Sequence, residues 1–326
     1  MAIKSGPDLR EPLATLIASS PGCEVMGYNS YHRGPSRPKL SMIETIATVE
    51  QNHELAPGFR LLVLVFEAPI EIRAGQFAML KAHGTEEPLL RRALAVYKVN
   101  GPRRLSFLYQ VMGRGTRALS HLGPGGRVET LLPLGNSWPM PGPVSVPSIH
   151  PTGPSTGKRV IVVAGGVGSA SVFMLCEELA RSGIETRVFF GATTRSALIG
   201  CGLEDFESLG LPLTLATDDG SEGERGFVTA PLTRYLQEAE PAGATIYACG
   251  PWVMMARVSE IAAGFKLPCA VSLEAPMGCG FGVCVGCVVA VKTEGPVGFD
   301  SYKRVCTDGS IFPAETIRWD VTAMTH

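Results

Sequence analysis

Four cysteines near the C-terminal end of the chain have the spacing C-x4-C-x2-C, followed by eighteen residues and a last cysteine. This is the spacing of plant-type [2Fe–2S] proteins, in which four thiolates ligate the iron. Three ligands on one tight loop need a backbone that can curl, and glycines such as Gly280 and Gly282 supply that freedom. A zinc site is the alternative, but it usually has two C-x2-C pairs, and the second pair is missing here. We therefore predict a [2Fe–2S] cluster on Cys279, Cys284, Cys287 and Cys306.

The composition is that of a globular chain. A length of 326 residues suits two or three domains, and a hydrophobic content of 45% is enough for their cores. The net charge of −1 gives no field that attracts nucleic acid or an anionic membrane. The longest uncharged run, from Val160 to Cys176, is too short for a membrane span and is interrupted by glycines. Because the N-terminus has no clean apolar segment, we expect a cytoplasmic protein without a secretory signal.

Changes in pattern divide the sequence into modules. Short β-rich runs such as 61–66, 93–99 and 105–112, separated by Gly and Pro, are typical of a small antiparallel barrel. A later segment alternates strand-like and helical patterns, which predicts a doubly wound parallel α/β sheet. We therefore expect a loose N-terminal extension (1–40), an antiparallel β-barrel (41–135), a Pro-rich linker (136–158), an α/β domain (159–267) and a small cysteine module (268–326).

Two glycine-containing turns follow predicted strands of the α/β segment. The first contains Gly165, Gly166 and Gly168 and leads into a predicted helix, so its N–H groups could approach a pyrophosphate. The second is the run Cys249-Gly250-Pro251. Open parallel sheets bind ligands at the carboxyl ends of their strands, so both turns could face one crevice. A tight connection explains each turn equally well, and Cys249 is either a packed small residue or a thiol beside a nicotinamide.

Three further features are open to two interpretations. Asp218 begins the run DDGS after the predicted strand 213–217, where it either forms a polar turn or contacts the adenosine half of a nucleotide. Arg92 belongs to a pair of arginines that is either solvated or offers its planar fork to a flavin pyrophosphate. Gly115 and Thr116 precede a predicted helix at 117–122, and a Gly-Thr pair at a helix start suits phosphate.

The order of these modules resembles the ferredoxin reductase superfamily. The cysteine module that follows resembles, more specifically, the electron-transfer subunit of class 1B dihydroorotate dehydrogenase. The resemblance covers about residues 43–320. It rests on Leu90-Arg91-Arg92, on YQVMGRGT at 109–116, on PLGN at 133–136, on 164–168, 217–221 and 247–251, and most specifically on the runs 272–274, 277–280, 286–288 and 305–309.

The resemblance implies three redox groups and a partner. It implies FAD in the barrel at Arg92, Ala93, Leu94, Ala95, Leu108, Tyr109, Gln110, Gly115 and Thr116. It implies NAD(H) on the central sheet at Gly165, Gly166, Gly168, Asp218, Cys249, Gly250 and Pro251, beside the [2Fe–2S] cluster. It also implies an FMN-containing catalytic subunit that oxidises dihydroorotate in pyrimidine (UMP) biosynthesis, in a heterotetramer. We expect the cluster loop to lie near that partner, and no side chain to act as a catalytic acid or base.

Some positions depart from the family pattern. The family's flavin strand usually reads Arg-Pro-x-Ser, whereas Ala93 and Ala95 stand at the Pro and Ser positions, so one hydroxyl hydrogen bond to the flavin is lost. Ser171 stands where the family has Pro. Two alternatives therefore stay open: an NAD(P)H electron-input module of another complex, of the ferredoxin:NADP reductase or hydrogenase type, and a non-enzymatic redox-sensing binder. The choice between NADH and NADPH is open as well.

Overall fold

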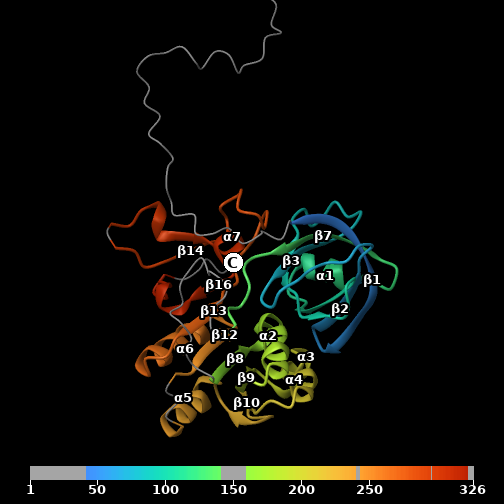
Figure 1. Ribbon diagram of the computed structural model, residues 1–326. Helices are drawn as coiled ribbons and strands as arrows, with labels where there is room; N and C mark the ends of the chain where they lie inside the picture. The colour runs from blue at the N-terminus through green and yellow to red at the C-terminus, as the bar shows by residue number, and fades with distance from the viewer. Residues whose placement is uncertain (1–41, 141–158, 240–242, 295, 322–326) are drawn as a thin grey trace, which may run out of the picture. The chain divides into compact units, whose positions relative to one another are not determined.

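The computed structural model describes residues 42–140, 159–239, 243–294 and 296–321. The predicted N-terminal extension and residues 141–158 of the predicted linker lie outside this part of the chain. Most of the described strands belong to two seven-stranded sheets, one antiparallel and one largely parallel (Figure 1). Within the described residues, every helix is too short or too polar to cross a bilayer.

The first sheet is antiparallel throughout and has the strand order β4-β3-β7-β1-β2-β6-β5. The predicted strand at 93–99 is divided into two, because its backbone changes partners at Val96 and Tyr97. The N–H of Val96 donates to the carbonyl of Gln76, just before β3 (3.0 Å), whereas that of Tyr97 donates to the carbonyl of Ser106 in β6 (2.8 Å). The chain thus passes from one end of the sheet to the other at this point, and the sheet curls. Its elements are β1 (Ile43–Ala56), β2 (Phe59–Val65), β3 (Phe77–Ala82), β4 (Arg92–Ala95), β5 (Lys98–Val99), β6 (Arg104–Gln110), α1 (Arg114–Ser120) and β7 (Arg127–Leu134).

The second sheet has the order β11-β10-β9-β8-β12-β13-β16, and all neighbours are parallel except β13 and β16. The predicted alternation of strands and helices is confirmed. The elements are β8 (Arg159–Gly165), η1 (Gly166–Gly168), α2 (Ser169–Arg181), β9 (Glu185–Ala192), α3 (Arg195–Gly200), α4 (Leu203–Ser208), β10 (Leu213–Thr217), β11 (Glu224–Arg225), α5 (Thr229–Glu238), β12 (Thr245–Cys249), α6 (Trp252–Gly264), β13 (Cys269–Ser272) and β16 (Ile311–Pro313).

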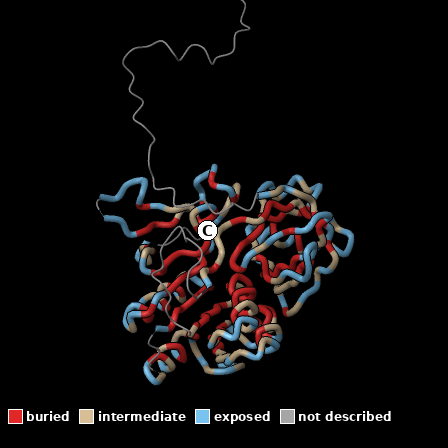
Figure 2. The backbone as a smooth tube through the Cα atoms, viewed as in Figure 1, coloured by how far each residue is buried: buried red, intermediate tan, exposed pale blue. Residues whose placement is uncertain are grey.

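Apolar side chains of the parallel sheet pack on both of its faces. Val160 and Val162 of β8 belong to one core cluster with the buried side of α2, whereas Ile161 and Val163 belong to another with α5 and α6. Successive side chains of a strand point to opposite faces of the sheet, and both faces of β8 are buried, so its alternate residues belong to different clusters. Figure 2 shows the buried residues concentrated in the strands of both sheets.

The C-terminal part contributes to two structures. β13 and β16, which follow residue 267, extend the parallel sheet. Between them lies a small two-stranded sheet with a short helix, formed by β14 (Val288–Ala290), η2 (Phe299–Ser301), β15 (Tyr302–Arg304) and α7 (Val305–Asp308), and η3 (Ala314–Thr316) follows β16. The cysteine module is therefore an insertion between two strands of the α/β sheet, which fixes it to that sheet at both ends.

The described start of the linker, residues 136–140, is anchored by polar contacts. The side chain of Asn136 donates to the carbonyl of Ile311 (2.8 Å) and accepts from its N–H (2.9 Å). Trp138 is buried, and its indole N–H donates to the carbonyl of Ser171 at 2.8 Å. The hydroxyl of Tyr247 donates to the carbonyl of Pro139 at 2.6 Å. This short segment thus joins the end of β7 to α2, β12 and β16.

Candidate functional site

The four predicted cluster ligands come from two elements that a hydrogen bond holds together. Cys279, Cys284 and Cys287 lie on the loop between β13 and β14, and Cys306 lies in α7. The N–H of Val305 donates to the carbonyl of Cys287 at 2.8 Å, which fixes α7 beside the loop. Within the loop, the N–H of Cys284 points to the sulfur of Cys279 at 3.5 Å. Cys287 and Cys306 are buried, whereas Cys284 is exposed.

Contacts within the cysteine set change their acidity. Burial alone would raise the pKa of Cys279, but the N–H groups of Cys284 and Phe281 donate to its sulfur and bring the pKa down to about 7. A hydrogen bond between the thiols of Cys287 and Cys306 lowers the pKa of Cys287 to about 6 and raises that of Cys306 far above its usual range. The deprotonated thiolate is the form that ligates metal. The sulfurs thus form two pairs, Cys279 with Cys284 and Cys287 with Cys306.

The described residues contain no group of three His, Cys, Asp or Glu side chains placed to hold a metal ion. A [2Fe–2S] cluster distributes four thiolates over two irons, so these four cysteines remain its candidate ligands. The loop has the curled backbone that such a site needs: Gly280 has a φ of +83°, and a Cβ there would lie 2.6 Å from the side chain of Met79 in β3. Only glycine fits at that position.

Apolar side chains are exposed around this loop. Leu89 is 79% exposed, Val283 73% and Phe281 44%. Leu89 and Phe281 also line a shallow hollow next to the cluster loop, together with Lys81, Leu90, Arg91, Glu129, Gly278 and Cys279. Exposed apolar side chains that gather at one place are typical of a surface that binds another protein.

The predicted flavin residues of β4 and α1 lie against each other. A Cβ at Gly115 would lie 2.1 Å from the Arg92 side chain. Because glycine has no Cβ, the guanidinium of Arg92 has room at this position. Arg92 donates to the carbonyl of Leu90 at 2.9 Å. The hydroxyl of Thr116 accepts from the N–H groups of Met112 (3.0 Å) and Gly113 (3.2 Å), where it caps its own helix. Arg92 and Gly115 therefore form one unit, and the Thr116 side chain is already engaged.

The other predicted flavin residues differ in what they could offer a ligand. Leu108 and Tyr109 of β6 are buried in the core, where the hydroxyl of Tyr109 donates to Asn52 at 3.2 Å. These two residues could therefore meet a cofactor through their backbone alone. Ala93 is exposed, and Leu94, Ala95 and Gln110 are half-buried, so they remain reachable from the surface.

The two glycine turns of the α/β sheet pack directly against each other. A Cβ at Gly168 would lie 2.6 Å from the backbone nitrogen of Gly250, and one at Gly165 would lie 2.9 Å from the ring of Pro251. Gly166 has a φ of +51°, in the left-handed region. The strand order changes direction between β8 and β12, and ligands bind at such a switch point in open α/β sheets. Close packing alone requires glycine at 165 and 168, and the switch in strand order makes this end of the sheet the candidate ligand site.

Cys249 ends β12 next to Gly250 and is buried. Burial and the nearby carboxylate of Glu274 raise the pKa of its thiol far above the usual range, although hydroxyls of Ser272 and Ser171 interact with the sulfur. Ser171 donates to Ser272 at 2.9 Å, and Ser272 donates to Ser310 at 3.4 Å. Cys249 is therefore a neutral thiol beside a chain of buried hydroxyls. The sequence analysis identified Ser171, as a departure from the family pattern, and Ser272, as part of the run 272–274, but not that they lie together.

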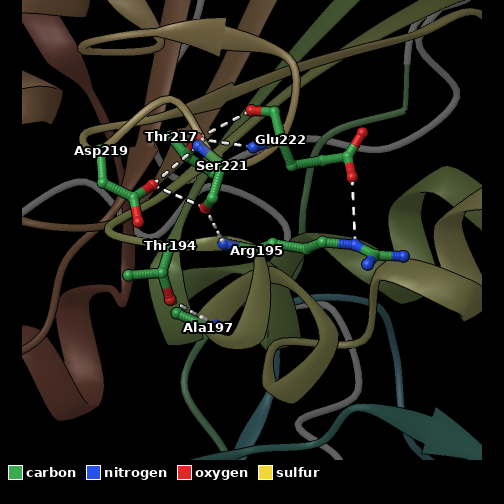
Figure 3. A network of polar contacts seen from close by, with 7 residues as sticks. All are labelled: Thr194, Arg195, Ala197, Thr217, Asp219, Ser221 and Glu222. Atoms are coloured by element: carbon green, nitrogen blue, oxygen red, sulfur yellow. Dashed lines mark hydrogen bonds and ion pairs between the residues drawn. The ribbon is translucent and has the colours of Figure 1, made fainter.

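Asp218 stands in the chain between Thr217 and Asp219, two members of a polar network at the carboxyl ends of β9 and β10 (Figure 3). The N–H of Asp218 donates to the carbonyl of Ala192 at 3.2 Å, which holds the two strand ends together. The carboxylate of the next residue, Asp219, accepts from both the N–H (2.9 Å) and the hydroxyl (2.6 Å) of Ser221. These bonds lower the pKa of Asp219 below its usual value. The network extends to Arg195 and Glu222, which the sequence analysis did not identify.

A family model described as the iron-sulfur cluster binding domain of dihydroorotate dehydrogenase B matches residues 274–318. Curated relatives include the protein named dihydroorotate dehydrogenase B (NAD(+)), electron transfer subunit, from Desulforamulus reducens. It is 35% identical over 259 residues, which are 78% of this chain and 91% of that protein. A homolog of this subunit from Aquifex aeolicus is 34% identical over 76% of this chain and 86% of its own length.

Solved structures share the fold. A chain of an NADH-dependent reduced ferredoxin-NADP oxidoreductase, studied for flavin-based electron bifurcation, has a TM-score of 0.70 at 25% identity and covers 85% of this chain and 91% of its own. A ferredoxin reductase of carbazole 1,9a-dioxygenase has a TM-score of 0.59 at 20% identity, with 71% and 68% covered. The curled antiparallel sheet followed by a parallel α/β sheet is thus a ferredoxin-reductase-like fold.

Proposed function

The chain belongs to the family of electron transfer subunits of dihydroorotate dehydrogenase B, and from this membership we propose that it carries electrons between NAD(H) and the FMN of a dihydroorotate-oxidising catalytic subunit. The reaction belongs to pyrimidine (UMP) biosynthesis. The single observation that carries the proposal is that hydrogen bonds bring Cys284 to Cys279, and the helix of Cys306 to Cys287, within the segment that the family model matches. We further propose that the two subunits form a heterotetramer.

The four cysteines would hold a [2Fe–2S] cluster, which takes up and releases one electron at a time. The lowered pKa values of Cys279 and Cys287 favour their thiolates, whereas the hydrogen bond with Cys287 raises the pKa of Cys306, so that thiol must give up its proton when it binds iron. One pair is buried in the core and the other reaches the surface. This division supports a path from the interior of the subunit to a partner bound outside, because electron transfer needs short separations.

The antiparallel sheet would bind FAD, which accepts hydride from the nicotinamide when it is bound. Arg92 would hold the pyrophosphate, since a guanidinium that lies against Gly115 can offer parallel N–H groups to two oxygens. The backbones of Leu108, Tyr109 and Gln110 would border the flavin, together with Ala93, Leu94 and Ala95. Thr116 would contribute through the backbone of its turn. No hydroxyl stands at Ala95, so flavin binding rests on the remaining contacts.

NAD(H) would lie across the switch point of the parallel sheet. The N–H groups of the turn with Gly165, Gly166 and Gly168 would face the pyrophosphate. The turn Cys249-Gly250-Pro251 would border the nicotinamide. There the raised pKa of Cys249 keeps the thiol neutral, so that it does not act as a nucleophile.

One observation favours a second candidate. The NADH-dependent reduced ferredoxin-NADP oxidoreductase chain covers a larger share of this chain than the other reductases that we compared, at a TM-score of 0.70. An electron-input module of a ferredoxin- and NADP-linked complex would use the same three redox groups. The two candidates differ in the partner and in the terminal substrate, and not in the chemistry within this subunit.

The test is made on the chain produced together with the FMN-containing catalytic subunit of its own source. Flavin and iron are assayed, and anaerobic visible spectra are recorded before and after NADH is added. We expect flavin bands and a [2Fe–2S] shoulder that both bleach, and reduction of NAD⁺ when dihydroorotate is supplied. Activity with ferredoxin and NADP but none with dihydroorotate would establish the second candidate. Iron without flavin, and no response to NADH, would instead establish a redox-sensing binder.

A further inference from the structure

The position of the adenosine half of the nucleotide follows from strand order, and this step rests on the proposed function. With the pyrophosphate at the turn after β8 and the nicotinamide at the turn after β12, the rest of the molecule must extend in the opposite direction. The next strands on that side are β9 and then β10. The adenosine ribose therefore reaches the network of Figure 3, which lies at the carboxyl ends of these two strands.

An arginine in this network is already paired. The Nε of Arg195, which follows β9, lies 3.2 Å from a carboxylate oxygen of Glu222, which follows β10. The backbone N–H of Arg195 donates to the hydroxyl of Ser221 at 2.8 Å, and that hydroxyl donates in turn to Asp219. The backbone of Glu222 is held on both sides by the hydroxyl of Thr217, at 2.8 and 3.1 Å. The backbone from which the Glu222 carboxylate extends is thus fixed by β10 itself.

We propose that Glu222, by holding Arg195, makes this site select the ribose 2′-hydroxyl of NADH over the 2′-phosphate of NADPH. A phosphate monoester carries nearly two negative charges at neutral pH and needs a cation with free N–H groups. Arg195 is the cation at the end of β9, and Glu222 competes for it. The carboxylate of Asp219 lies in the same network and adds repulsion toward a phosphate, whereas a hydroxyl can donate to a carboxylate.

Two other guanidiniums lie near this loop. Arg225 packs the aliphatic part of its side chain against Gly220, where an added Cβ would lie 3.1 Å from it, and this contact does not involve its guanidinium. Arg234 is paired with Glu224 on β11. The turn itself carries the carboxylates of Asp218, Asp219 and Glu222. Carboxylates therefore outnumber the guanidiniums of Arg195 and Arg225, and the local field opposes a 2′-phosphate.

The test compares Glu222→Gln with wild type in the full complex. The kcat/KM values for NADH and NADPH are measured with ferricyanide as acceptor, so that the catalytic subunit does not limit the rate. In parallel, binding of 2′-phospho-AMP and of AMP is measured by calorimetry. We expect Glu222→Gln to raise the NADPH/NADH ratio and the preference for 2′-phospho-AMP about tenfold, as one new charge-assisted hydrogen bond would. Adding Arg195→Ala should abolish this gain.

Glu224→Gln is the matched control, because it removes the same charge from a neighbouring ion pair and leaves Arg195 untouched. Its NADPH/NADH ratio should stay at the wild-type value. An equal gain in Glu224→Gln, or no gain in Glu222→Gln, would overturn the role of Glu222. If wild-type protein does not oxidise NADH at all, the proposed function fails, and this outcome is distinct from an unchanged ratio.

Discussion

The four cluster cysteines differ in what the protein does to each sulfur. Cys287 and Cys306 share a hydrogen bond that makes one thiol more acidic and the other less. Cys176 and Cys269, by contrast, are buried in apolar surroundings, which raises the pKa of both thiols. The residue type is the same, and the environment decides between ligand and packed side chain. The sequence spacing predicts the four ligands, and their role stays a prediction.

Replacement of Cys284 by Ser tests the ligand set at small structural cost, because this side chain is exposed. Since the cluster has only four thiolates, we expect bound iron to fall below about a tenth of the wild-type content. NADH-dependent ferricyanide reduction through the flavin should survive, and electron transfer to the catalytic subunit should be lost. Cys201→Ala is the control: that thiol is buried away from the cluster loop, so iron should be retained. Full iron content in Cys284→Ser would exclude Cys284 as a ligand.

The nucleotide site shows where inference from the sequence ends. The run DDGS predicted a polar turn, and both the turn and Asp218 lie at the expected strand end. The sequence did not show that the next carboxylate, Asp219, turns back onto Ser221. That bond depends on the turn geometry, in which Gly220 takes a φ of +78°. Arg195 lies 27 residues before Glu222, so only the pairing of β9 with β10 brings the two together.

At the scale of elements, the carboxylate of Asp205 joins α4 to the curled sheet through two polar contacts. The hydroxyl of Tyr97, between β4 and β5, donates to the carboxylate of Asp205 at 2.7 Å, and Lys98 pairs with the same carboxylate at 2.6 Å. Tyr97 is fully buried, and burial raises its pKa, so its hydroxyl remains a donor. Asp205→Ala would leave this hydroxyl without its acceptor. We expect a loss of about 1–3 kcal/mol in the free energy of unfolding.

A double-mutant cycle isolates the hydrogen bond between Tyr97 and Asp205. Tyr97→Phe removes the hydroxyl and should cost about 1 kcal/mol. In the Tyr97→Phe background, Asp205→Ala should cost less than in wild type, because only the partly exposed pair with Lys98 is then lost. Thermal denaturation of the four proteins gives the coupling energy. Strictly additive shifts would mean that the hydrogen bond between the two elements contributes nothing.

Elements with a strong local pattern were predictable, and short ones were not. The predicted strand 213–217 agrees with β10, and the helix predicted after the turn at 165–168 is α2. α3 and α4 have six residues each, too few for helical periodicity to be visible. β13 and β16 have four and three residues, and their place in the parallel sheet is set by tertiary pairing.

At the scale of the whole molecule, the order of the modules could be predicted from the sequence, because each one carries its own motif. The contacts that join the modules could not be predicted, since they are made between segments that lie far apart in the chain. The cysteine module begins and ends in strands of the α/β sheet, and its loop packs on Met79 of the antiparallel sheet. The proposed cluster would therefore be fixed against both of the parts that we assign to FAD and NAD(H). A rigid frame of this kind suits electron transfer, which depends on constant distances.

The exposed apolar side chains of Leu89, Phe281 and Val283, here called the cluster face, lead to a last prediction. If the catalytic subunit binds there, Val283→Lys places a charge in an apolar contact and should weaken the complex about tenfold or more. The control is Phe227→Lys, because Phe227 is 75% exposed, against 73% for Val283, and lies between β11 and α5. The dissociation constant is measured by titration calorimetry, with NADH–ferricyanide activity as a check of folding. Equal weakening by both variants, or by neither, would exclude the cluster face as the docking site, since a specific contact must distinguish two surfaces of equal exposure.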